Sequence, residues 1–324
     1  MPRIILHLKP ADTCNNLKGW HLRLYRDIRD LCEVDGIALE IRERDNDIRV
    51  GTRRVRDRRF ADGNLHIIDD RSVEAEGVLN AAVAYLWEYW HLDPIGTKAF
   101  SSIGHMTYDP SSVAPKRTEA FMRNLKNRYV DSRKSKYRQP FVRLDLPTGA
   151  ISVFFQGRYP MASGASQHSD SKILRATQEA AGDRPIIVKP HPMSSDASDR
   201  RMVEDLAKED DRIFLVDANV HDILAASACT ISNNSTVALE GFMHGVPAIH
   251  CGRSDFHHLA EDGSDLSQLQ TAIQKAVGTR HDYDTYLTWY FVKHCIHLRS
   301  GKLNEILWDR FARAGFPRER FLDG

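Results

Sequence analysis

The sequence predicts an α/β protein built from two Rossmann-like domains that face a central cleft. Short apolar runs alternate with amphipathic stretches of helical period, which is the pattern of parallel strands joined by crossover helices. The chain has 324 residues, enough for two domains of ordinary size. A segment between 109 and 149, rich in Lys and Arg and punctuated by Pro and Gly, interrupts the alternation. We therefore expect domains over 1–148 and 149–280, with C-terminal helices over 281–324 that pack back across the cleft.

The first half of the chain shows this alternation less clearly. It begins with an apolar strand at 3–8 and continues with an amphipathic helix over 17–36, in which apolar residues recur every three or four positions. The next predicted elements are two strands and an apolar helix, over 37–43, 65–69 and 76–90.

The second half alternates without interruption from residue 150 to residue 251, so we expect an open, doubly wound sheet there. The five predicted strands are 150–157, 185–192, 212–217, 229–233 and 246–251. The four helices between them cover 169–183, 197–210, 219–228 and 235–245. Two further amphipathic helices are predicted over 283–298 and 302–316.

Composition narrows the class of protein. Lys and Arg number 45 and Asp and Glu 44, so no overall charge attracts nucleic acid. The five cysteines are scattered and form no Cys-x-x-Cys pair, which argues for a reduced chain without structural zinc. No apolar run approaches the roughly 20 residues that a spanning helix needs. We expect a cytoplasmic protein with no nucleic-acid partner. Peripheral association with the inner membrane, or with an assembly complex, stays open.

Polar residues follow two of the strands in the second half. The apolar run 186–188 ends in Lys189, His191 and Pro192, and this abrupt stop turns polar groups toward the edge of the sheet where such folds bind ligands. Another strand ends in "SNNST", residues 232–236.

Ser235 and Thr236 open the helix that follows this second strand. Free backbone N–H groups and the positive end of the helix dipole make such a start an anion site, with phosphate as the expected anion. The alternative is that both residues are ordinary N-caps and that the Lys-Pro-His-Pro turn lies on the surface. Glu240, one turn further along, is expected either to reach the ribose of a nucleotide or to be solvated.

The segment 88–105 is expected to form a wall of the cleft in the first domain. Trp90 would hold an acceptor sugar, and Asp93 or His105 would act as general base on its attacking hydroxyl, a role that requires a proton acceptor within hydrogen-bond reach. The alternative places Trp90 in the core and makes Asp93 the cap of a turn.

Two charged or histidine-rich stretches carry weaker hypotheses. The basic stretch 53–59 could bind phosphate or an anionic polymer, although such runs are more often solvated. The stretch 250–258 places three histidines around Asp255 in a spacing that matches no metal site, so we expect a loop over a nucleotide and no metal.

The segments 171–192 and 219–252 resemble bacterial capsule polysaccharide biosynthesis proteins, the group that contains the Kdo transferases of capsule and lipopolysaccharide assembly. A looser similarity extends to bacterial sialyltransferases, whose His-Pro and Ser-Ser/Thr motifs bind a CMP-sugar. The resemblance covers about 150–255 and implies a GT-B fold whose C-terminal domain holds the donor nucleotide. It implies that Lys189 and His191 contact the donor's phosphate or base. The donor-binding residues expected on this basis are Gln156, Gly157, Arg158, Lys189, His191, Pro192, Ser232, Asn234, Ser235, Thr236 and Glu240.

One departure from the family's pattern concerns catalysis. Its Kdo transferases carry an acidic residue, thought to be the nucleophile, in the stretch that corresponds to 154–166. Gln156 and Gly157 agree with the pattern, but Pro160 or Met161 stands where the carboxylate is expected. A covalent sugar–enzyme intermediate at that position would lack its nucleophile.

The function expected from these observations is transfer of a sugar from a nucleotide-activated donor, a CMP-sugar such as CMP-Kdo, to a bacterial surface glycan or glycolipid. Asp93, His105 and His191 are the expected catalytic residues, and no metal or cofactor is needed if protein groups neutralise the departing phosphate. Two alternatives stay open. One is a GT-B transferase or epimerase that uses a UDP- or GDP-sugar, and the other is a catalytically silent nucleotide-binding subunit of a capsule assembly complex.

Overall fold

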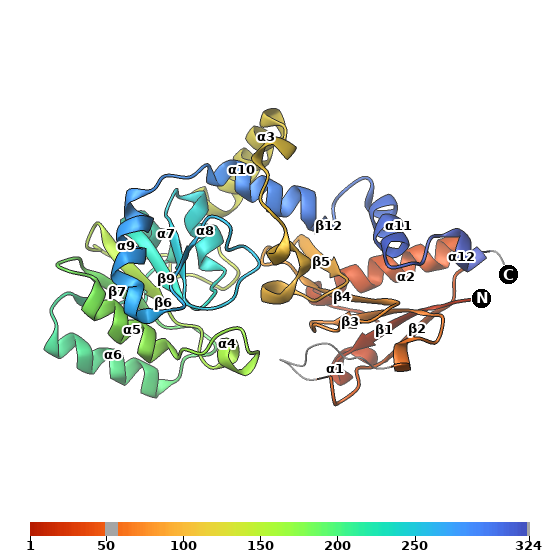
Figure 1. Ribbon diagram of the computed structural model, residues 1–324, viewed down its shortest axis with the longest axis horizontal. Helices are drawn as coiled ribbons and strands as arrows, with labels where there is room; N and C mark the ends of the chain where they lie inside the picture. Colours follow the sequence, from red (N-terminus) through yellow and green to blue (C-terminus); the bar gives the residue numbers. More distant parts are fainter. Residues whose placement is uncertain (49–57, 323–324) are drawn as a thin grey trace. The chain divides into compact units, whose positions relative to one another are not determined.

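The computed structural model describes residues 1–48 and 58–322, which form two compact units (Figure 1). The first unit joins Met1–Met106 to the C-terminal segment that begins at His294. The second unit is Thr107–Lys293. Each unit is a mixture of helices and a mostly parallel sheet, as the alternation predicts.

The first unit contains a six-stranded sheet in the order β12-β5-β4-β3-β1-β2. Its strands are β1 (Ile4–Leu8), β2 (Leu39–Glu43), β3 (Leu65–Asp69), β4 (Val78–Val83), β5 (Tyr89–Asp93) and β12 (Ile296–His297). Strands β2, β1, β3 and β4 are parallel, whereas β5 and β12 run antiparallel to their neighbours. One face is covered by α2 (Arg23–Asp35) and α11 (Leu303–Arg313), whose apolar residues share one core with the strands. The short helices are α1 (Pro10–Thr13) and α12 (Glu319–Leu322).

The helix predicted over 76–90 is wrong: this stretch forms β4 and the first two residues of β5. Tyr85 takes a positive φ of 65° and reverses the chain, so that Val83 pairs with Trp90 in antiparallel register. A continuous apolar run fits a buried strand as well as a buried helix, because neither leaves an alternation of polar and apolar positions. Helix α2 also begins later than expected, at Arg23.

The second unit contains a fully parallel six-stranded sheet, and each predicted strand is present. The strands are β6 (Ala150–Phe154), β7 (Ile186–Lys189), β8 (Ile213–Leu215), β9 (Ser227–Ser232), β10 (Ala248–His250) and β11 (Glu261–Asp262). Their spatial order is β8-β7-β6-β9-β10-β11. Within this unit the order reads third, second, first, fourth, fifth, sixth, which is the Rossmann order, and the direction of winding reverses between β6 and β9. Ligands of such sheets bind outside the carboxyl ends of the strands at this switch point.

Helices cover both faces of this sheet. Apolar residues of α5, α6 and α9 pack on one face, and those of α7 pack on the other. The helices of the unit are α3 (Pro115–Lys126), α4 (Tyr159–Ala162), α5 (Asp170–Ala180), α6 (Ala197–Glu209), α7 (Val220–Ala226), α8 (Val237–Met243), α9 (Leu269–Gly278) and α10 (Tyr283–Thr288). None of the helices in the described residues is both long and apolar enough to span a membrane.

The two units divide at 106/107 and 293/294, whereas the sequence suggested 148 and 280. Helix α3 packs against α10, and Lys126 pairs with Asp284 at 3.0 Å. Further along, Arg133 pairs with Asp222 of α7 at 2.5 Å. The segment that looked like a linker therefore belongs to the second unit, because its partners lie there.

Candidate functional site

The loops after β6 and β9 meet at the switch point of the second unit. The side chain of Gln156 donates from Nε2 to Oδ1 of Asn234 at 2.9 Å, and its Oε1 accepts from the backbone N–H of Asn234 at 2.8 Å. This reciprocal pair fixes the spacing between the two loops. It brings together two residues that the sequence placed in the donor site. We call Gln156, Gly157 and 233–236 the switch-point residues.

Asp170 fixes the switch-point residues by accepting hydrogen bonds from three of them. Its Oδ2 accepts from the backbone N–H groups of Gln156 and Gly157, at 2.8 and 2.7 Å, and its Oδ1 accepts from Nδ2 of Asn233 at 3.3 Å. Ser169 caps α5 and so places Asp170 in the first helical turn, where the helix dipole favours a carboxylate. Burial nevertheless raises the pKa of Asp170 to about 6.

The sequence analysis missed Asp170. The carboxylate was expected at Pro160 or Met161, which lie in α4, and Asp170 is ten and nine positions further along, respectively. An acidic residue in the first turn of the helix that follows the ligand-binding loop was the available signal. Because both of its oxygens accept hydrogen bonds from the chain, Asp170 is a positioning residue.

Gly157 allows the loop after β6 to touch the loop after β7. Its φ is +67°, and an added Cβ would lie 2.5 Å from the backbone oxygen of Ser194. Only glycine fits such a left-handed position in close contact with another backbone. This contact places the loop after β7, which includes His191, beside the loop that contains Gly157.

His191 presents a neutral N–H group at this edge of the sheet. Its Nδ1 accepts from the backbone N–H groups of Met193 and Ser194, at 3.1 and 3.0 Å, so in the neutral ring the proton is on Nε2. Burial lowers its pKa, and Lys136 lowers it further. The ring packs edge-on against Tyr137, with 5.0 Å between ring centroids. His191 can therefore donate a hydrogen bond at neutral pH, but it brings no positive charge.

Lys189 has partners within the chain. Its Nζ donates to the carbonyl of Ala218 at 2.7 Å and lies 3.5 Å from Oδ1 of Asp217. Burial lowers its pKa. These contacts connect the end of β7 to the segment before α7, which is a structural role. Pro192 and Arg158, two other residues expected in the donor site, are exposed.

The start of α8 matches the N-cap alternative in part. Ser232 Oγ accepts from the N–H of Ser235 at 3.0 Å, and Ser235 Oγ accepts from the N–H of Val237 at 3.3 Å. Thr236, the residue before the helix, makes no capping hydrogen bond with its side chain.

His191 and Thr236 follow strands that are not adjacent in the sheet. Strand β6 lies between β7 and β9, so the ends of these two strands are roughly 10 Å apart. A nucleotide is long enough to extend over this distance.

Glu240 is buried, so it is neither solvated nor exposed to the ribose of a nucleotide. It is 3% exposed, and burial raises its pKa to about 7, while a hydrogen bond from Ser135 and the charge of Lys136 act in the opposite direction. Ser135 belongs to residues 133–140, which we call the docking segment. This segment also contacts His191 through Tyr137 and α7 through Gln139, whose Oε1 accepts from the N–H of Val220 at 3.0 Å. It forms a wall of the site that the sequence did not predict.

The buried Glu240 carboxyl predicts a pH-dependent stability. Its folded pKa, about 7, lies above the ordinary value of 4.5. Protonation therefore favours the folded state, and the stability present below about pH 4.5 is lost as the pH rises through 7. Because glutamine does not ionise, Glu240→Gln should avoid this loss, which amounts to roughly 3 kcal/mol in the free energy of unfolding. Urea unfolding between about pH 4 and pH 8 should show the variant gaining on the parent as pH rises. A difference in unfolding free energy between variant and parent that stays constant across this pH range would contradict a raised pKa of Glu240.

Asp93 and His105 lie in the first unit. The Asp93 carboxylate is 4% exposed and accepts four hydrogen bonds, from the N–H groups of Ile95, Gly96 and Ser102 and from the Ser102 hydroxyl. This geometry favours the turn-capping alternative over the general-base hypothesis. Trp90 is buried in the core and is not an acceptor platform. His105 is exposed at the end of a short 3₁₀ turn, Ser102–His105.

One other hypothesis concerns the basic stretch 53–59. Residues 53–57 of the basic stretch lie outside the described residues, and Arg59 forms ion pairs with Asp45 and Asp47 at 2.7 and 2.5 Å.

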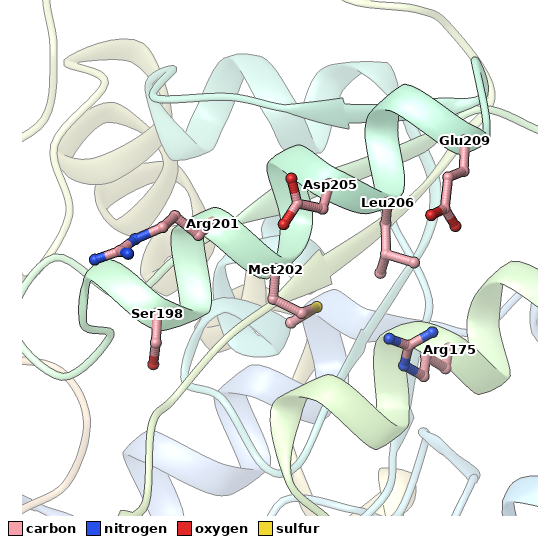
Figure 2. A pocket seen from close by; sticks show the side chains of 7 residues that line it. All are labelled: Arg175, Ser198, Arg201, Met202, Asp205, Leu206 and Glu209. Atoms are coloured by element: carbon pink, nitrogen blue, oxygen red, sulfur yellow. The ribbon is translucent and has the colours of Figure 1, made fainter.

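A groove of about 430 Å³ lies between α5 and α6 (Figure 2). Its lining carries both positive and negative side chains and contains none of the switch-point residues. The groove is therefore not the candidate site. The lining residues are Arg175, Ser198, Arg201, Met202, Asp205, Leu206 and Glu209.

One protein family matches the second unit. The family described as "Capsule polysaccharide biosynthesis protein" matches residues 107–295, more than half of the chain and the whole of the second unit. No curated protein matches the sequence.

Solved structures share the fold. The structure titled KpsC, beta Kdo 2,7 transferase, from Thermosulfurimonas dismutans, aligns with a TM-score of 0.55 and 14% identity, over 97% of this chain and 100% of that one. A second structure from the same organism, titled KpsC, beta Kdo 2,4 transferase, aligns with a TM-score of 0.52 and 14% identity, over 89% of this chain and 90% of that one. At this identity the likeness concerns the fold alone.

Proposed function

The chain belongs to the capsule polysaccharide biosynthesis protein family, and from this premise we propose that it is a glycosyltransferase that uses a nucleotide-activated sugar. The observation that carries the proposal is the switch point of the second unit. Two loops are fixed there by Gln156 and Asn234, and His191 offers an N–H donor about two strand spacings from Thr236. A nucleotide is a ligand of suitable length and polarity for this arrangement.

The proposed division of labour follows from the geometry. The Ser235 and Thr236 hydroxyls and the N–H of Thr236 bind the phosphate, because the N–H groups of Gln156, Gly157, Asn234 and Ser235 already donate within the chain. The His191 N–H binds a second part of the nucleotide. Such fixed donors stabilise the charge that develops on the departing phosphate without a metal ion. The acceptor is a glycan or glycolipid of the bacterial surface.

The proposed donor is a CMP-sugar, with CMP-Kdo as the first candidate. The resemblance to Kdo transferases and sialyltransferases supports this choice, as do the titles of the two aligned structures. Calorimetric titration of the protein with CMP, UDP and GDP tests it. Tightest binding of CMP is expected, and tighter binding of UDP or GDP would overturn the choice of donor.

Replacing His191 tests the proposed site. His191→Asn keeps an oxygen that can accept from the N–H groups of Met193 and Ser194 but removes Nε2–H. Loss of one such hydrogen bond should weaken CMP binding about tenfold, as measured by calorimetry. His281→Ala, at an exposed histidine of the same unit, is the matched control and should bind CMP like the parent. Equal affinity of both variants would remove His191 from the site.

A catalytically silent nucleotide-binding subunit is the second candidate. It is favoured by the saturated carboxylate of Asp93 and by the absence of a carboxylate at positions 160 and 161. Measuring sugar transfer from CMP-Kdo separates the two candidates, because the silent subunit binds CMP but produces no glycosylated acceptor.

A further inference from the structure

Two tryptophans lie at the edge of the first sheet where its parallel strands end, which is the edge that binds ligands in open α/β sheets. Trp20 lies between β1 and α2, and Trp87 lies in the turn that joins β4 to β5. Strands β1, β3 and β4 run parallel, so the segments that follow them share this edge. Tyr25, in the first turn of α2, donates to Asp69 at the end of β3 at 2.9 Å, which fixes the start of α2 there.

The two indole rings contact each other at the surface of the first unit. Their centroids are 4.0 Å apart, and the ring planes form an angle of 63°. Trp20 is 50% exposed, and it is the one tryptophan among the exposed large apolar side chains of the described residues. Trp87 is half-buried. Trp87 therefore supports the ring of Trp20, which keeps an uncovered aromatic surface.

Both indole N–H groups are available to a ligand. Neither Trp20 nor Trp87 has a hydrogen-bond partner for its side chain within 1–48 and 58–322. The N–H of Trp308, a half-buried tryptophan of the same unit, instead donates to Asp35 at 3.1 Å. The pair thus offers an aromatic face together with two hydrogen-bond donors.

His21 adds a polar ring beside Trp20. Its ring centroid is 5.6 Å from that of Trp20, and its side chain is 40% exposed. Its Nε2 lies 3.1 Å from Oδ1 of Asp12, and because a carboxylate accepts, the proton of the neutral ring is on Nε2 and Nδ1 is an acceptor. Gly19 has a φ of +119°, and a Cβ there would lie 3.0 Å from the His21 ring, so glycine is needed for this turn.

This combination of groups matches the chemistry of a sugar ring. A face of a pyranose presents C–H groups that pack on an aromatic ring, and its edge presents hydroxyls that both donate and accept. The indole N–H groups and His21 Nδ1 supply the complementary donors and acceptor. An acyl chain would use the aromatic face alone. A nucleobase also has a flat face and polar edges, so it is the competing ligand.

We propose that Trp20 and Trp87 form a platform on which a sugar ring of the acceptor glycan binds. The proposal rests on the proposed function, because it takes the acceptor to be a glycan. It gives these two residues the role that the sequence assigned to Trp90, which lies in the core. The platform belongs to the first unit and is separate from the proposed nucleotide site in the second.

¹⁹F NMR of the full chain labelled with 5-fluorotryptophan tests the proposal. The chain has five tryptophans, whose resonances are assigned by single replacements with phenylalanine. Galactose, N-acetylglucosamine and Kdo are the sugar probes, and cytidine is the nucleobase probe. Saturable shifts of the Trp20 and Trp87 resonances with at least one sugar, and none with cytidine, are expected. The Trp308 resonance should not move.

A pair of matched variants tests the contribution of the exposed ring. Trp20→Leu keeps an apolar side chain but removes the aromatic face and the N–H group. It should weaken that sugar at least about tenfold, as followed at the Trp87 resonance. Trp308→Leu makes the same change at the tryptophan whose N–H is already bonded to Asp35, and it should bind the sugar like the parent. The shifts in the parent chain test the platform even if Trp20→Leu does not fold.

The contradicting outcomes are distinct from failure of the proposed function. Absence of a saturable shift at Trp20 and Trp87 with all three sugars, a shift of either resonance with cytidine, or undiminished sugar binding in Trp20→Leu would overturn the platform. CMP titration of the same samples reports separately on the nucleotide site. Trp20→Leu should bind CMP like the parent, and loss of CMP binding in this variant would contradict the separation of the two sites. A parent chain that binds sugar but no CMP would contradict the proposed function and leave the platform in place.

Discussion

Replacing Asp170 with alanine should destabilise the second unit and abolish measurable nucleotide binding. The change leaves the N–H groups of Gln156 and Gly157, and the amide of Asn233, without their acceptor. Buried donors left unpaired cost about 1–3 kcal/mol each, so a loss of roughly 3 kcal/mol or more is expected. Hydrogen exchange of peptides that contain β6 and β9 measures this locally, which avoids assuming that both units unfold together.

Two further variants test whether the effect of Asp170→Ala comes from the loss of its hydrogen bonds to the switch-point residues. Asp170→Asn retains an oxygen for the two backbone donors and should recover most of the lost stability. Asp265→Ala removes an exposed carboxylate of the same unit that also accepts from a backbone N–H, that of Ser267 at 3.0 Å, and should cost well under half as much. Equal losses for Asp170→Ala and Asp265→Ala would show that Asp170 does not hold the switch point.

Replacing Gly157 with alanine should have the second-largest effect. The new Cβ would lie 2.5 Å from the Ser194 oxygen, in a backbone with φ of +67°. The positive φ alone costs about 1–2 kcal/mol for a residue with a side chain, and relief of the clash requires the loop after β7 to move away. Because that loop carries His191, CMP affinity should fall at least about tenfold, as measured by calorimetry.

Gly182→Ala is the matched control for this substitution. Gly182 has a φ of +58°, but nothing lies within 4 Å of the added Cβ. It should show the conformational cost without loss of CMP binding. If Gly157→Ala binds CMP as tightly as Gly182→Ala, the contact between the two loops does not position His191.

The fold of the second unit could be predicted from the sequence because its signals are local. The run 186–188 lies between Pro185 and the Lys189-Pro190 pair, and the strand predicted at 229–233 is followed directly by polar residues and a helix. Each strand is short and each intervening helix has an apolar stripe, so periodicity alone orders them. The hairpin of β4 and β5 has no such boundary, and its apolar residues match either structure.

The candidate site could be predicted only in part because its remaining contacts are long-range. Gln156 and Asn234 were identified, since both directly follow strands. Asp170 was not, because its partners lie 13 and 14 positions earlier in the chain. The docking segment contacts Glu240 and His191 from a stretch that has the composition of a linker. No sequence pattern tells where a loop of this kind will pack.

A crystal structure of the protein with CMP tests the central claim most directly. We expect the nucleotide across the carboxyl ends of β7, β6 and β9, with the His191 Nε2–H donating to it and its phosphate at the loop that contains Thr236. CMP bound elsewhere, or bound without contact to His191 and to the switch-point residues, would contradict this expectation.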